Sequence, residues 1–116
     1  MRTLLISGDA PPPRPLRDVI ARGSTALEER RAGEVSSDVA ATPDIDRIVF
    51  WATAGDAVVT NLARDCAGVE RASGRETIVF VTPQGTEAKV DGLLPNEVFV
   101  WPRDEDRLKM AFMTGG

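Results

Sequence analysis

The sequence predicts an α/β fold in which residues 1–116 form a single domain, a three-layer α/β/α sandwich with a central parallel sheet. Short apolar runs of strand length alternate along the chain with stretches whose apolar residues recur at helical spacing, and this alternation predicts parallel strands joined by helices. The run at residues 46–52 is β-branched and aromatic from Ile48 onward, which is typical of a parallel strand covered on both faces. A length of 116 residues suits one compact domain.

The first half of the chain begins with a predicted strand at residues 3–7. A proline-rich stretch at residues 10–15 follows, and its prolines forbid a helix there. The apolar spacing then predicts a helix that begins at Leu16, includes Leu27 on its apolar face and stops at Gly33. Residues 34–44 are expected to form an irregular connection with at most one very short strand.

The second half of the chain continues the alternation after the strand at residues 46–52. Helical spacing predicts a helix from about Asp56 to Gly74, followed by a strand at residues 77–82. Residues 87–94 could form a brief helix, and residues 98–101 are a further strand that Pro102 ends. Acidic residues at positions 104–106 suit the start of a last helix, because they complement the helix dipole.

Composition and charge exclude several classes of function. The net charge of −4 argues against binding to nucleic acid or to an anionic membrane, either of which favours a basic surface. The apolar stretch at residues 1–7 is too brief for a signal peptide, and no apolar run is long enough to span a bilayer. Cys66 is the only cysteine and cannot form an internal disulfide, which fits a cytoplasmic location. The absence of histidine excludes histidine-based catalytic triads and zinc sites.

The strand ends carry a resemblance to the receiver domain of two-component response regulators, which has a flavodoxin-like fold. Trp51 stands where that family has its phosphoacceptor aspartate, and Thr82 stands where the family has a threonine or serine. The last strand of a receiver ends in a Lys-Pro pair, whereas this one ends in Trp101 and Pro102. The first strand of a receiver runs into a pair of acids that hold magnesium, but here Asp9 is the one acid that follows it.

These departures imply a degenerate receiver, or pseudo-receiver, that is not phosphorylated. Phosphoryl transfer to a receiver needs an aspartate nucleophile, acidic ligands for a divalent ion and a lysine. The resemblance therefore implies a non-catalytic module, without metal or cofactor, that acts in signalling or scaffolding through a protein partner or as a homodimer. In receivers the face around the last strand and last helix makes such contacts, which implies an interface at Leu94, Val98, Val100, Leu108 and Phe112. The alternative is that these side chains complete the core.

The degenerate pocket would contain six residues at the ends of the strands, namely Asp9, Trp51, Thr53, Asp56, Thr82 and Trp101. Four of them have a plainer alternative: the two tryptophans as core residues, Asp9 as a turn residue and Asp56 as a helix cap. Cys66 is interpreted as buried filler and not as a nucleophile.

A second hypothesis is a small-molecule or nucleotide-binding domain whose crevice contains Asp9, Thr53, Asp56, Thr82 and Gln84. A third, an enzyme that uses carboxylates such as those of Asp9 and Asp56, is left open without a paired-acid motif to support it.

Overall fold

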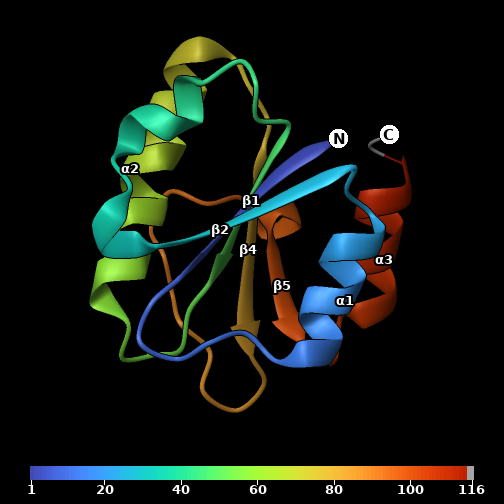
Figure 1. The fold of residues 1–116 in the computed structure, drawn as a ribbon. Helices are drawn as coiled ribbons and strands as arrows, with labels where there is room; N and C mark the ends of the chain where they lie inside the picture. The colour runs from blue at the N-terminus through green and yellow to red at the C-terminus, as the bar shows by residue number, and fades with distance from the viewer. Residues whose placement is uncertain (115–116) are drawn as a thin grey trace.

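A five-stranded, fully parallel sheet lies between two layers of helices in the computed structural model, which describes residues 1–114, with side chains up to Phe112 (Figure 1). The strand order is β2-β1-β3-β4-β5, which is the flavodoxin-like order. The α/β fold class and the parallel sheet predicted from the sequence are therefore confirmed. The strands are β1 (Arg2–Ser7), β2 (Ala26–Arg31), β3 (Arg47–Trp51), β4 (Ile78–Pro83) and β5 (Val98–Trp101).

The two faces of the sheet are covered unequally. Helices α1 (Arg14–Arg22) and α3 (Glu105–Thr114) lie together on one face, and α2 (Ala57–Ser73) lies on the other (Figure 1). The α2 face also carries two short 3-10 helices, η1 (Ala32–Glu34) and η2 (Ser37–Ala41), and η2 packs against α2. Among the described residues, α2 is thus the one α-helix of its layer, so this layer of the sandwich is thinner than its counterpart.

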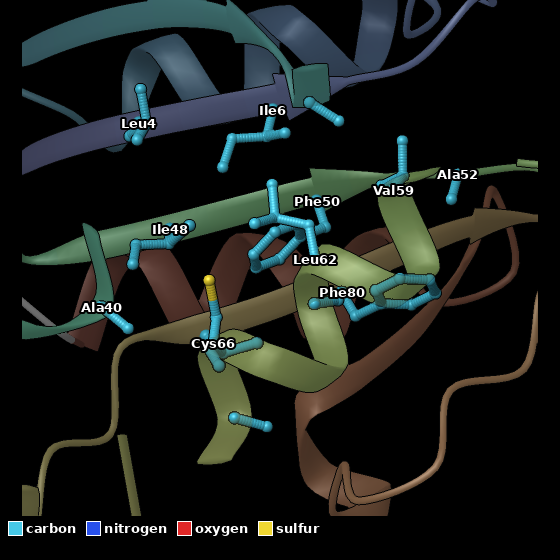
Figure 2. Packing of buried hydrophobic residues seen from close by; sticks show 14 of the residues in the cluster. Leu4, Ile6, Ala40, Ile48, Phe50, Ala52, Val59, Leu62, Cys66 and Phe80 are labelled. Carbon is cyan, nitrogen blue, oxygen red and sulfur yellow. The ribbon is translucent and has the colours of Figure 1, made fainter. Parts of the chain in front are cut away.

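Side chains along each central strand alternate between two cores, as the pleat of a strand requires. On β3, Ile48 and Phe50 face α2, whereas Val49 and Trp51 face α1 and α3. Figure 2 shows the α2 side, where Phe50 and its neighbours on β1 and β4 meet the apolar stripe of α2, including Cys66. This alternation explains the unbroken apolar run of β3, because both of its faces are buried.

The helix predicted from Leu16 to Gly33 is wrong beyond Arg22. Helix α1 begins at Arg14 with Pro15 in its first turn, where a proline is tolerated, so the prediction that residues 10–15 contain no helix is wrong for its last two residues. The helix ends at Arg22 with Gly23 as its C-cap, and residues 26–31 form the edge strand β2, which pairs with β1 from Arg2↔Ala26 to Ser7↔Arg31. Its sequence is charged and mostly exposed, as is common where an edge strand must avoid pairing with other chains. Residues that favour a helix locally are held as a strand by their pairing with β1.

Two connections differ from what the sequence allowed: residues 34–44 contain no short strand, and residues 87–94 contain no brief helix. The first connection folds as η1 and η2, and the second ends in the 3-10 helix η3 (Pro95–Glu97). The guanidinium of Arg75 holds the first connection in place, because it donates hydrogen bonds to the carbonyls of Thr42 at 2.6 Å and Ile45 at 2.7 Å. Within residues 1–114 there is no helix with the length and apolar character that crossing a bilayer demands.

Candidate functional site at the carboxyl edge of the sheet

The two tryptophans at the strand ends belong to the core on the side of α1 and α3. Trp51 is 4% exposed and Trp101 is 8% exposed, and both pack in one cluster with Leu16 of α1 and Leu108 of α3. Both tryptophans are therefore core residues, as the plainer of the two interpretations stated. The indole Nε1 of Trp51 is buried and has no hydrogen-bond partner among the described residues. The carboxyl end of β3 therefore carries an apolar ring that faces the core.

Thr82, Thr53 and Gln84 hold loops in place at this edge. The buried hydroxyl oxygen of Thr82 accepts a hydrogen bond from the backbone N–H of Ala88 at 2.7 Å. Thr53 forms an isolated antiparallel bridge with Glu87, which ties the loop after β4 to the segment after β3. The backbone N–H of Gln84 donates to the carbonyl of Trp101 at 2.8 Å, and its side chain is exposed. The hydroxyl of Thr82 is thus already engaged.

Asp56 occupies the N-cap position of α2, but its side chain does not cap the helix. Its side chain makes no capping hydrogen bond and lies instead against Gly8, where an added Cβ would stand 2.6 Å from Asp56 Oδ1. Asp56 Oδ2 is buried and has no hydrogen-bond partner among the described residues. The interpretation of Asp56 as a helix cap is therefore right for its position and wrong for its side chain, whose carboxylate faces the end of β1.

A hollow of about 300 Å³, here called the Gly8 hollow, opens beside Asp56. Of the predicted crevice residues, Asp9 and Asp56 line it, whereas Thr53, Thr82 and Gln84 do not. Its charged groups are three acids and one arginine, so it favours ligands that donate hydrogen bonds. Within the described part of the chain, no three acidic, cysteine or histidine side chains are grouped closely enough to hold a metal ion. Its lining consists of Ser7, Gly8, Asp9, Arg31, Ala32, Gly33, Glu34, Asp56 and Val58.

Three of the five predicted interface residues are in the core. Leu108 and Phe112 belong to α3 and are 0% and 3% exposed, and Val100 of β5 is buried as well. Val98 is partly buried against the α2-side cluster, which leaves Leu94, at 52% exposed, as the surface residue of the set. The proposed interface is therefore corrected for Leu108, Phe112 and Val100, which complete the core as the alternative interpretation stated.

Cys66 is buried between α2 and the sheet, as its helical spacing indicates (Figure 2). Burial, with the nearby Asp65 and Glu70 carboxylates, raises the pKa of the Cys66 thiol to about 12. Because the thiolate is the reactive form, this cysteine is unsuited to nucleophilic chemistry at neutral pH.

Sequence reasoning missed Glu70, which is 5% exposed on α2. One of its carboxylate oxygens accepts a hydrogen bond from the backbone N–H of Thr77, and burial is the main cause that raises the pKa of Glu70. Its position four residues after Cys66 on the apolar stripe was the available signal, because side chains at that spacing share a helix face.

Comparisons of the chain with protein-family models, with curated proteins and with solved structures found no match. The strand order and the chemistry of the two sheet edges are therefore the basis of the functional proposal.

Proposed function

We propose that this chain is a non-catalytic, pseudo-receiver module that acts in signalling or scaffolding through contact with a protein partner, and that it is not phosphorylated on aspartate. The observation that carries the proposal is Trp51, whose indole is buried beneath α1 and α3, at the strand end where a receiver domain would have its phosphoacceptor. The flavodoxin-like strand order supports the same interpretation.

The chemistry of the carboxyl edge agrees with loss of phosphoryl transfer. A receiver needs a nucleophilic carboxylate at the end of β3, but an indole offers no nucleophilic oxygen. It also needs a cation to balance the transferred charge, and Trp101 replaces that lysine. The third group, the Thr82 hydroxyl, is bound to the amide of Ala88.

Incubation with acetyl phosphate and Mg²⁺, followed by intact-mass measurement, tests the proposal. We expect the mass to stay unchanged, while an authentic receiver domain treated in parallel gains one phosphoryl group. A stoichiometric adduct on this chain would overturn the proposal. Asp9→Asn and Asp56→Asn variants would then show which carboxylate accepted the group.

The homodimer is tested separately by sedimentation velocity over a range of protein concentrations. We expect a concentration-dependent rise in the average sedimentation coefficient. A monomer at every concentration would refute self-association, and the partner would then have to be a different protein.

The Gly8 hollow supports a second candidate function, binding of a small molecule at the carboxyl edge. The supporting observation is the buried, unpartnered Asp56 Oδ2, which is suited to accept a hydrogen bond from a ligand. Because the hollow is mainly acidic, a nucleotide would have to bind through its ribose hydroxyls or base and not through its phosphates.

Thermal shift with a panel of nucleosides and nucleotides tests this second candidate. A ligand present at about 100 times its Kd would stabilise the fold by about 2.7 kcal/mol. The shift should be lost in Asp56→Asn and kept in Asp38→Asn, which changes an exposed acid away from the hollow. No shift with any ligand would count against this candidate.

A further inference from the structure

A groove with a buried acid at its centre lies at the amino edge of the sheet, opposite the Gly8 hollow. It consists of two adjoining hollows of about 160 Å³ and 200 Å³, here called the inner and outer hollows of the Glu70 groove. Both are lined by Glu70 of α2, by Glu76 before β4, and by Leu94 and Glu97 around η3. Segments distant in sequence therefore enclose one space around the Glu70 carboxylate.

The Glu70 carboxylate has an unused acceptor oxygen. Oε1 accepts the backbone N–H of Thr77, and the backbone N–H of Ile78 also acts on the carboxylate, but Oε2 is buried and makes no hydrogen bond of ordinary geometry among the described residues. A buried carboxylate oxygen without a donor is unfavourable, by about 1–3 kcal/mol. The nearby Arg75 does not supply the donor, because its guanidinium is bonded to backbone carbonyls of the 40–45 segment.

The inner hollow combines this acceptor with apolar walls. Ile78, Val79 and Phe99 form its floor, and a space of about 160 Å³ is close to the size of a cavity that accepts benzene. Its charged lining comprises three glutamates and one basic side chain, Arg47, which extends toward the carbonyl of Glu76 at 3.5 Å. Arg71 and Arg75 line the outer hollow instead. The inner hollow thus offers negative charge above an apolar floor.

From this arrangement we propose that the Glu70 groove binds a small organic ammonium ion, that is, a primary amine on a compact apolar body. Oε2 of Glu70 is closed off from solvent, so binding would require a rotation of the Glu70 side chain that turns this oxygen into the hollow. The ammonium would then donate to Oε2, and the apolar body would pack against Ile78 and Phe99. A charged donor is favoured over a neutral one because hydrogen bonds between ionised partners are the stronger kind. This site is at the opposite edge from the degenerate pocket and does not depend on the pseudo-receiver proposal.

One structural alternative needs no ligand. The hydroxyl of Thr77 is also buried and without a hydrogen-bond partner among the described residues, and it belongs to the residue whose amide already bonds Glu70. A small local shift that lets this hydroxyl donate to Glu70 Oε2 would satisfy both groups. In that case the groove would have no preference for a charged ligand.

Titration with benzylammonium, followed by isothermal calorimetry and by amide NMR, separates these two possibilities. Benzyl alcohol has the same apolar body without the charge, and benzoate reverses the charge. We expect saturable binding of benzylammonium about tenfold tighter than that of benzyl alcohol, and no binding of benzoate. The amide shifts should centre on Thr77 and Ile78. Equal affinity for the amine and the alcohol, no saturation, or shifts centred elsewhere would overturn the proposal.

Variants identify the group that binds. Glu70→Gln should weaken benzylammonium binding about tenfold, while Asp65→Asn, an exposed acid on the same helix, should leave it unchanged. Should Glu70→Gln fail to fold, Glu76→Gln provides the test, because this exposed side chain lines both hollows and its loss should still weaken binding severalfold. Equal weakening by Asp65→Asn would show a non-specific charge effect and refute the site.

Discussion

The contact between α1 and α3 at Gly23 gives a quantitative test of the packing that buries both tryptophans. An added Cβ on Gly23 would stand 2.4 Å from the Cβ of Phe112, whereas ordinary contacts begin near 3.4 Å. The backbone φ of Gly23 is −85°, so an alanine there meets no conformational strain. Gly23→Ala therefore acts by steric overlap alone, and Phe112 with its helix must move by about 1 Å.

The expected cost follows from two opposing effects. Overpacking of this size destabilises a core by about 1–3 kcal/mol. Alanine also lowers the conformational entropy of the unfolded chain, which offsets this loss of stability by about 0.4–1 kcal/mol. A net loss of about 1–2 kcal/mol should lower the urea midpoint by about 1 M, as followed by the fluorescence of the buried tryptophans.

Gly68→Ala is the matched control, because Gly68 lies in the interior of α2 and an added Cβ there meets no atom within 4 Å. It should stabilise the protein by up to about 1 kcal/mol. If Gly23→Ala raised the midpoint as Gly68→Ala does, then α1 and α3 would not pack as described.

Three further predictions concern buried polar groups. Burial raises the pKa of Glu70 in the folded protein, so its contribution to stability is complete below its unfolded pKa and is lost as the pH rises through the folded pKa. The urea-unfolding free energy of Glu70→Gln should therefore fall less than that of the wild type from about pH 4 to pH 7, and parallel curves would contradict this. Because the pKa of Cys66 is raised to about 12, iodoacetamide at about pH 8 should label the protein in urea but not the folded form, as measured by mass; rapid labelling of the folded form would contradict its burial. Thr82→Val removes the acceptor for the buried Ala88 amide and should cost about 1–3 kcal/mol in urea unfolding, whereas an unchanged midpoint would mean that this bond is not formed.

The parts of the fold that the sequence predicted are those with strong local patterns. Strands β3 and β4 are apolar on both faces, and α2 carries a regular apolar stripe, so periodicity identifies them. Strand β2 lacks such a pattern, because it is an edge strand that pairs only with β1 and its side chains are mostly exposed. Its alanine, leucine, glutamates and arginines favour a helix in isolation, and pairing with β1 overrides that preference. Gly23 was the signal for the earlier helix end.

The candidate site was harder to predict, because it depends on where side chains point. The sequence places Trp51 at a strand end, but only the register of the sheet shows that it faces α1 and α3. The sequence also allows Asp56 to cap α2, yet the carboxylate turns to the space that Gly8 leaves open. These outcomes depend on contacts between segments distant in the sequence, such as Trp51 with Leu16 and Leu108 or Asp56 with Gly8, which local patterns do not encode.

Both edges of the sheet contain a buried carboxylate oxygen without a hydrogen-bond partner among the described residues. At the carboxyl edge this oxygen is Asp56 Oδ2, beside the Gly8 hollow, whereas both tryptophans belong to the core and the Thr82 hydroxyl is bonded to the backbone. At the amino edge, Glu70 is buried with one oxygen unpartnered and an open hollow beside it. An acid at this position has a structural role, because Glu70 accepts the buried backbone N–H of Thr77, which a leucine or methionine would leave without an acceptor. A ligand that donates to Glu70 would satisfy the second oxygen as well, and the benzylammonium titration decides whether the groove has that use.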